Sequence, residues 1–185
     1  MTDLPALLVV QQHDTSADQL RHRRTHLPER AVHTALRSEL KALDARIATA
    51  QQAQAGHSAT QAKLEAEAAT CEQKVADLDR KLRTSTVPKE AEALQAERRS
   101  TLARQRSLED EVLAVMEALE PLELELMELD EQRAELDSRL TVAAAELAAA
   151  EAVVDGELAG VLALREAAAA PVPDAVLSLY DRQRA

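Results

Sequence analysis

The feature that most constrains the fold is a pair of heptad stripes that mirror each other about Pro88. Both stripes alternate steps of three and four residues without slipping, which is the spacing of a left-handed coiled-coil seam. The first stripe is Leu36, Leu40, Leu43, Ile47, Ala50, Gln54, His57, Gln61, Leu64, Ala68, Cys71, Val75, Leu78 and Leu82. The second is Leu94, Arg98, Thr101, Gln105, Leu108, Val112, Val115, Leu119, Leu122, Leu126, Leu129, Arg133, Leu136 and Leu140. A chain that turns back at Pro88 brings Leu64 opposite Val112 and Leu36 opposite Leu140. The stripes therefore predict an all-α fold built on a long antiparallel coiled-coil hairpin.

The composition supports thin helical seams rather than a rounded core. The chain has no Trp and no Phe, and Tyr180 is its single aromatic residue. Because aromatic rings supply much of the burial in compact cores, burial here must come from Leu, Val, Ile and Ala. Each fully buried Leu or Val is worth roughly 1.5–3 kcal/mol, so many in series can stabilise a hairpin.

Prolines divide the chain into predicted helices at about 3–26, 28–83 and 88–169, with short N-terminal and C-terminal helices at the base of the hairpin. Pro28 and Pro88 suit the first turn of a helix. Pro171 and Pro173 end the third predicted helix. We expect one hairpin domain over residues 1–170 and a Pro-led short helix within 171–185. We expect the first helix to continue the line of the second and pair with residues 148–169, while Val176–Tyr180 packs on the same region. The alternative is a first helix that folds back into a local three-helix bundle.

A hinge is predicted at Gly56 and Pro121. Pro121 interrupts the third helix but leaves the heptad phase unchanged, which indicates a kink rather than a break. In the mirror register Pro121 faces the neighbourhood of Gly56, a helix-weakening residue, and the adjoining seam is polar. The alternative is two tolerated imperfections that coincide.

Two arginines, Arg98 and Arg133, occupy seam positions. Burying their charge is costly unless the stems lie along the seam and the heads reach carboxylates such as Glu131 or Asp44. We expect them to fix the register of the hairpin.

Basic residues gather around the predicted tip, whereas residues 109–137 are almost wholly acidic. Two interpretations apply, a solvated helix surface with pairs at i, i+4 and a basic tip that docks an acidic partner or an RNA backbone. The residues that would carry the second are Arg80, Lys81, Arg83, Lys89, Arg98, Arg99 and Arg104.

No constellation for catalysis is found in the sequence. His22 and His26 are four apart with Asp18 one turn earlier, but a third strong ligand in a fixed place is missing, so we predict exposed histidines rather than a metal site. Cys71 occupies a seam position where a small thiol packs well. The sequence contains neither a nucleophile motif nor a phosphate-binding glycine loop. We therefore predict a non-enzymatic protein with no cofactor in this chain.

The formal charge of −11 argues against non-specific attraction of the whole chain to nucleic acid or to anionic membranes. No apolar run is long enough to span a bilayer, and residues 1–5 lack the basic start of a signal peptide. We expect a cytoplasmic protein, monomeric or homodimeric.

Several segments resemble bacterial C4-type zinc-ribbon coiled-coil proteins, most closely the actinobacterial branch. They are residues 7–15 (LLVVQQHDT), 20–24 (LRHRR) and 27–29 (LPE), residues 87–90 (VPKE) and 93–95 (ALQ) at the tip, and the ending 176–184 (VLSLYDRQR). His13 stands where that family usually has Leu, and Val87 where it often has Asn. The two CxxC pairs of the ribbon would follow Arg184, so no zinc ligand carries over to a residue of this chain, and zinc is expected only in a longer form.

The resemblance implies two roles. Members of the zinc-ribbon family are generally described as nucleic-acid binding through the ribbon, and some relatives act as chaperones or partners of flagellar and sigma-factor proteins. We expect a coiled-coil adaptor or chaperone-like protein that binds a protein partner through the hairpin tip or base. The alternative is a nucleic-acid-associated factor that uses the basic tip.

Overall fold

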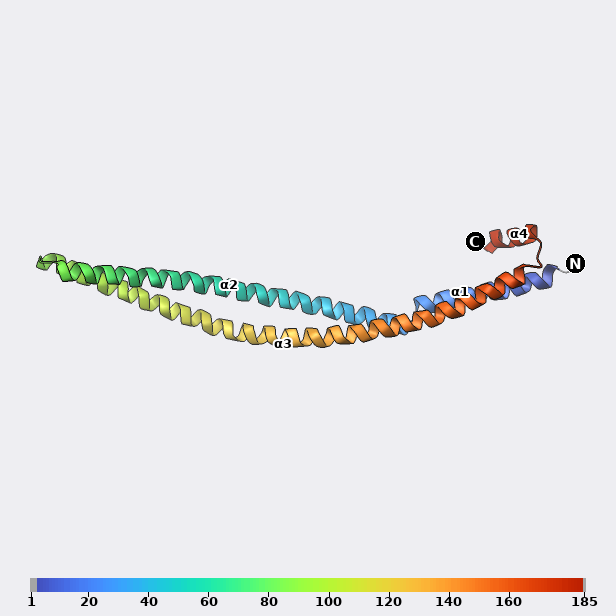
Figure 1. The fold of residues 1–185 in the computed structure, drawn as a ribbon, viewed down its shortest axis with the longest axis horizontal. Helices are drawn as coiled ribbons and strands as arrows, with labels where there is room; N and C mark the ends of the chain where they lie inside the picture. Colours follow the sequence, from blue (N-terminus) through green and yellow to red (C-terminus); the bar gives the residue numbers. More distant parts are fainter. Residues whose placement is uncertain (1–2, 185) are drawn as a thin grey trace. The chain divides into compact units, whose positions relative to one another are not determined.

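The computed structural model describes residues 3–184 as four α-helices joined by short turns (Figure 1). They are α1 (Asp3–Thr25), α2 (Pro28–Thr84), α3 (Pro88–Ala169) and α4 (Asp174–Arg184). Residues 3–184 contain no strand. The predicted all-α hairpin fold is confirmed.

The turn between α2 and α3 occupies only residues 85–87. The Ser85 amide donates to the Lys81 carbonyl over 3.0 Å, and the Ala91 amide donates to the Val87 carbonyl over 3.0 Å. Pro88 fills the first position of α3, where the N–H that it lacks would have had no partner within the helix. A connection this short forces the two helices to run antiparallel.

By their internal contacts the residues form two compact units. Residues 41–134 contain the turn and are called the tip unit here. Residues up to Leu40, together with those from Glu135 onward, contain the described ends of the chain and are called the terminal unit.

Within the tip unit, ion pairs join α2 to α3 in the mirror register. Asp79 Oδ1 accepts from Arg98 Nε at 2.6 Å, and Asp44 Oδ1 accepts from Arg133 Nε at 2.8 Å. Asp79 and Arg98 lie nine and ten residues from Pro88, and Asp44 and Arg133 lie 44 and 45 residues from it. The equal offsets confirm both the fold-back at Pro88 and the bridging role expected of the two arginines.

The seam supplies the core of both units. All of the seam positions except Arg133 are at least partly shielded from solvent. Arg133 is exposed, and its guanidinium binds Asp44 while its charge stays hydrated, as expected of a seam arginine whose head reaches a carboxylate. The buried apolar side chains of the tip unit are Leu43, Ile47, Ala50, Leu78, Leu108, Leu119 and Leu129.

Within the terminal unit, α1 lies beside the C-terminal part of α3 (Figure 1). Arg24 Nε donates to Asp155 Oδ1 at 2.7 Å, and Arg23 Nη1 donates to Glu157 Oε2 at 2.9 Å. Arg30, in the first turn of α2, pairs with Glu151. Successive parts of α1 and α2 therefore meet successive parts of α3, as expected for a first helix that pairs with residues 148–169.

The predicted hinge residues both lie within unbroken helices of the tip unit, Gly56 in α2 and Pro121 in α3. A Cβ built on Gly56 meets no atom within 4 Å, so close packing does not require glycine there. The hinge stays a prediction, and the division between the two units falls elsewhere, after Leu40 and after Ala134.

None of the helices, over the residues described, has a stretch long and apolar enough to cross a bilayer.

Candidate interaction sites

The structure places the predicted tip residues on both sides of the 85–87 turn and engages some of them within the hairpin. Arg98 binds Asp79, and Arg104 Nη2 lies 3.3 Å from Glu67 Oε2. Arg80 pairs with Asp77 on its own helix. Arg98 and Arg104 therefore bridge the two helices, and Arg80 is paired within α2, so the guanidinium groups of all three already have acidic partners.

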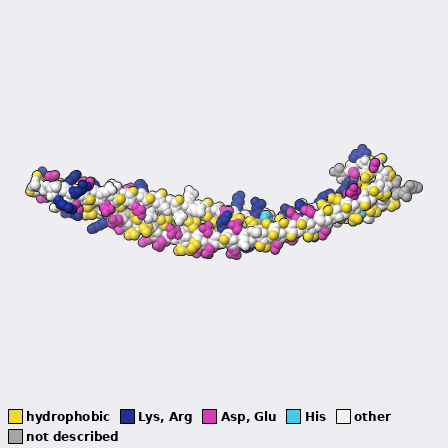
Figure 2. All heavy atoms as spheres, in the orientation of Figure 1, with side chains coloured by type: hydrophobic (Ala, Val, Ile, Leu, Met, Phe, Trp, Pro, Cys, Tyr) yellow, Lys and Arg dark blue, Asp and Glu magenta, His cyan; other side chains and the backbone are white. Residues whose placement is uncertain are grey.

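Three other predicted tip residues have no acidic partner in the described part of the chain. They are Arg83 at the end of α2, Lys89 in the first turn of α3, and Arg99, and all three are exposed. Lys81 is exposed as well and contributes to lowering the pKa of Glu97, although the hydrogen bond from Lys74 is the main cause. Figure 2 shows Lys and Arg side chains gathered at this end of the tip unit.

An exposed apolar side chain lies in the turn itself. Val87, the last residue of the turn, keeps 52% of its surface exposed. With Arg83 and Lys89 four and two residues away in the sequence, and Arg99 about three turns into α3, the region offers both an apolar anchor and positive charge. That combination suits an acidic partner segment that carries an apolar side chain.

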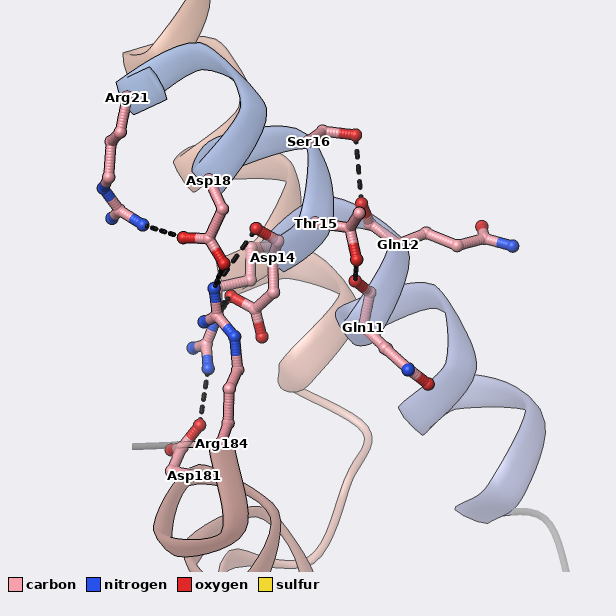
Figure 3. Close-up of polar contacts among 10 residues, drawn as sticks. Gln11, Gln12, Asp14, Thr15, Ser16, Asp18, Arg21, Asp181 and Arg184 are labelled. Carbon is pink, nitrogen blue, oxygen red and sulfur yellow. Dashed lines mark hydrogen bonds and ion pairs between the residues drawn. The ribbon is translucent and has the colours of Figure 1, made fainter. Parts of the chain in front are cut away.

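A second cluster surrounds Asp14 on α1, where sequence reasoning had identified no site (Figure 3). The Asp14 side chain is 4% exposed, and its Oδ1 lies 2.8 Å from both Arg165 Nε and Arg184 Nη1. Arg165 also donates to Asp181 Oδ1 at 2.7 Å, and Arg184 also binds Asp18. The cluster therefore ties α4 to both α1 and α3.

Electrostatic effects in this cluster follow from its geometry. The hydrogen bond from Arg184 is the main reason why the pKa of Asp18 is lowered. Partial burial, followed by the nearby Asp14 carboxylate, raises the pKa of Tyr180. Both shifts favour the protonation states that hold α4 in place near neutral pH.

The sequence of the first helix carries a weak stripe at helical spacing, in which Val10, His13 and Ala17 are expected to pack. Val10, Asp14 and Ala17 are spaced by four and three residues and are 0%, 3% and 1% exposed. His13, which the stripe would have placed at the packed position, is only half-buried. Heptad spacing therefore identifies position 14 as a packed position, but it does not indicate which basic residues compensate a carboxylate there.

The histidine pair on α1 and the turn after it forms a stack rather than a ligand set. The His22 and His26 ring centroids are 3.9 Å apart, and His26 Nδ1 lies 2.8 Å from the His22 carbonyl oxygen. Over the described residues, no group of three or more His, Cys, Asp or Glu side chains is arranged to hold a metal ion. Cys71 is half-buried and not disulfide-bonded.

One groove in the tip unit runs between α2 and α3. Small and apolar residues form its floor, Ala68 and Ala69 from α2 and Val112 and Leu113 from α3. Acidic residues stand at its rim, namely Glu65, Glu72 and Glu109. The tip unit therefore presents a basic surface near the turn and an acidic, apolar surface further along α3.

Comparisons with known proteins agree on the fold. Two Mycobacterium tuberculosis proteins, Rv2229c of strain H37Rv and MT2288 of strain CDC 1551, both described as uncharacterized, are 33% identical over 189 residues. Each match covers 97% of this chain and 74% of the relative.

Solved structures show the same hairpin. A Mycobacterium smegmatis protein superposes with a TM-score of 0.85 at 27% identity, covering 97% of this chain and 75% of that one. CT398 from Chlamydia trachomatis superposes with a TM-score of 0.79 at 15% identity, with the same coverage, and shows the fold alone. The family model for the CT398-like coiled coil hairpin domain matches residues 10–185, so the chain belongs to the CT398-like coiled-coil hairpin family.

Proposed function

We propose that this protein is a non-enzymatic adaptor whose hairpin tip binds an acidic segment of a protein partner. The observation that carries the proposal is that the exposed Val87 lies at the turn, with the exposed cations Arg83 and Lys89 on either side of it in the sequence and the exposed Arg99 further along α3; none of the three cations has an acidic partner in the described chain. The other surface considered, the base, is already occupied by contacts of α4 with α1 and α3. The tip therefore offers the more accessible site.

The choice of a protein over a nucleic acid rests on the surroundings of these cations. Ten carboxylates and no basic residue lie between Glu109 and Glu131 in the same unit, and they would repel a phosphate backbone that extended from the tip along α3. Aromatic residues on which bases could stack are missing near the turn, since the sequence holds only Tyr180. An acidic peptide needs only a short contact at the tip itself.

A photo-crosslinking amino acid at position 87 tests the proposal in cells that express the full chain. We expect one discrete protein adduct, which the combined Arg83→Glu, Lys89→Glu and Arg99→Glu variant removes. The same crosslinker at Leu164, which has a similar exposed fraction, is the matched control. A pattern of adducts identical at positions 87 and 164 would refute tip-directed binding.

A nucleic-acid role is the second candidate and uses the same cations. Anisotropy of a labelled single-stranded RNA and a labelled DNA duplex, measured at about 50 and 200 mM salt, separates the two roles. Steep salt dependence that the triple tip variant abolishes would favour the nucleic-acid role. The informative substitutions are Arg83, Lys89 and Arg99, because Arg98 and Arg104 also hold the two helices together.

We also propose that the likeness to zinc-ribbon proteins reflects a longer form of the chain. The support is the sequence resemblance to zinc-ribbon proteins. The family match does not add to it, because that match describes the coiled-coil hairpin domain. Paired CxxC motifs in the reading frame after Ala185, together with bound zinc in the longer product, would establish it. A reading frame that stops at Ala185 would contradict it.

A further inference from the structure

One side of α3 in the tip unit carries apolar side chains that no part of that unit covers. Leu113, Met116, Leu124 and Met127 are 57%, 46%, 58% and 56% exposed. At about 100° per residue, all four fall within a sector of about 80° on the helix surface, which we call the α3 flank. Single exposed apolar residues are ordinary, whereas a set aligned on one side of a helix is typical of an interaction surface.

Carboxylates lie among these apolar side chains. Those within the α3 flank or at its edges are all exposed, namely Glu109, Glu117, Glu120, Glu123 and Glu131. The segment from Glu109 to Glu131 holds ten carboxylates and no basic residue. Among the described residues, Glu111 is the only one of the ten that pairs with a cation, with its Oε1 3.5 Å from Arg104 Nη1.

The opposite helix does not neutralise this negative charge. Residues 45–67 of α2 face residues 109–131 in the mirror register and hold two basic side chains, Arg46 and Lys63, against two acidic ones, Glu65 and Glu67. Figure 2 shows hydrophobic and acidic side chains gathered along the α3 side of the tip unit. This part of the unit is therefore apolar and uniformly negative at once.

We propose that the α3 flank binds a basic amphipathic helix of a partner protein. The apolar stripe of such a helix covers Leu113, Met116, Leu124 and Met127, and its Lys and Arg side chains reach the carboxylates beside them. The two methionines suit this role because their unbranched side chains adapt to differently shaped apolar neighbours. The site goes beyond the basic tip, since it selects a partner of the opposite charge.

The groove between α2 and α3 supports this position for the partner. It lies beside Leu113, and its floor of Ala68, Ala69 and Val112 leaves room for one apolar side chain of the bound helix. Its rim carboxylates, Glu65, Glu72 and Glu109, come from both helices. A Lys or Arg one turn from the inserted side chain would therefore find an acidic group on either side of the groove.

Charge complementarity selects this occupant over a second copy of the same surface. Two copies of the α3 flank would set carboxylates against carboxylates, because residues 109–131 offer no basic side chain to pair with them. A nucleic acid is disfavoured for the same reason. A basic helix satisfies the carboxylates and covers the apolar side chains together.

The dimensions of the flank set the length of the partner and the strength of binding. From Glu109 to Glu131 it extends over 22 residue steps, which is about 33 Å or six turns of helix. A single helix docked on an open surface forms a small, transient interface. We therefore expect a reversible complex with a Kd in the micromolar range that weakens as salt rises.

A labelled synthetic helix tests the proposal with the full chain. The probe is a peptide of Leu and Lys, about six turns long, with Leu at helical positions i, i+3, i+4 and i+7. The control peptide has the same composition in an order that spreads Leu around the helix, so its charge is equal but its apolar stripe is lost. In fluorescence anisotropy we expect the amphipathic peptide to bind about tenfold more tightly than the control peptide.

Variants at exposed positions locate the site. Glu120→Lys should weaken binding of the amphipathic peptide by about fivefold or more, because it replaces an attraction with a repulsion. Glu125→Lys is the matched control, an equal charge change about 100° away around the helix, and should cost less than about twofold at physiological salt. The uncharged double variant Leu113→Gln and Leu124→Gln should also cost about fivefold or more, and Leu164→Gln, which is likewise 57% exposed in the parent residue, should cost nothing.

Three results would overturn the proposal. They are equal binding of the two peptides, equal losses for Glu120→Lys and Glu125→Lys, and a parent protein that binds neither peptide. Sedimentation velocity over about 1–200 µM protein tests the other occupant. Self-association that Glu120→Lys abolishes would assign the flank to a second copy and would also overturn it.

These outcomes are distinct from those for tip binding. Arg83, Lys89, Arg99 and Val87 are unchanged in every variant used here, so the crosslinking test at position 87 is unaffected. A protein that gives the discrete adduct at position 87 but binds neither peptide refutes the α3 flank as a site and retains the tip. A protein that binds the amphipathic peptide without that adduct does the reverse.

Discussion

Replacing Asp14 with Asn should destabilise the terminal unit and release α4. The substitution keeps the shape of the side chain but removes the charge from its contacts with Arg165 and Arg184, both at 2.8 Å. A hydrogen bond to a charged group contributes about 1.5–3 kcal/mol and a neutral one about 0.5–1.5 kcal/mol. Two such contacts weaken together, so the expected loss is about 2–3 kcal/mol. It stays below the cost of an isolated buried charge because Arg165 keeps Asp181 as a partner and Arg184 keeps Asp18.

Tyr180 makes this loss directly measurable. It is the only aromatic residue and lies on α4, so its fluorescence reports the docking of α4 while far-UV circular dichroism reports all helices. We expect the midpoint temperature of the tyrosine fluorescence transition to be about 8–24 °C lower in Asp14→Asn, since 1 kcal/mol shifts the midpoint of a unit of this size by about 4–8 °C.

The matched control is Asp181→Asn, which removes one contact to Arg165 from an aspartate whose side chain is 49% exposed. We expect it to cost less than about 1 kcal/mol. If Asp14→Asn is no more destabilising than Asp181→Asn, the buried carboxylate does not hold α4 and the argument fails.

Three further changes probe the seam and the charges. Leu108→Ala should lower the free energy of unfolding by about 2–5 kcal/mol in urea titrations, because Leu108 is 1% exposed. Gln61→Leu, which sets an apolar residue opposite Val115 in the mirror register, should raise that free energy by about 1–2 kcal/mol, and a loss would contradict the seam assignment. Since the pKa of Asp18 is lowered and that of Tyr180 is raised, the stability that each adds should be lost progressively as the pH falls below about 4 and as it rises above about 10 respectively. Asp18→Asn melted at pH 3 and pH 7 checks the acid limb, and equal losses at both would count against it.

The hairpin could be predicted from the sequence because the two heptad stripes support each other. Two stripes of the same period, mirrored about a proline, leave one way to pack leucines such as Leu78 and Leu108 out of water. The pairing of α1 with the end of α3 followed from the lengths of the helices alone. Arg133 is exposed at its seam position because a guanidinium on a long stem can keep its charge in water while it binds Asp44.

The Asp14 cluster could not be assigned from periodicity. Heptad patterns identify apolar positions, whereas Asp14 is buried because two arginines that are more than 150 residues away compensate its charge. Such pairing depends on the position of α4, which the stripes do not fix. The tip was predicted as a basic region, but only the structure separates Arg98, bound to Asp79, from Arg99, which is free of acidic partners in the described chain.

The most direct test of the antiparallel hairpin is one distance within the tip unit. Spin labels on Glu67→Cys and Arg104→Cys in a Cys71→Ala background, diluted with unlabelled protein, report on residues whose side chains pair at 3.3 Å across the two helices. The hairpin predicts a label separation of about 10–25 Å, which covers the reach of two labels on neighbouring helices about 10 Å apart. One continuous helix would place these residues, which are 37 positions apart in the sequence, about 55 Å apart, and that result would contradict the account.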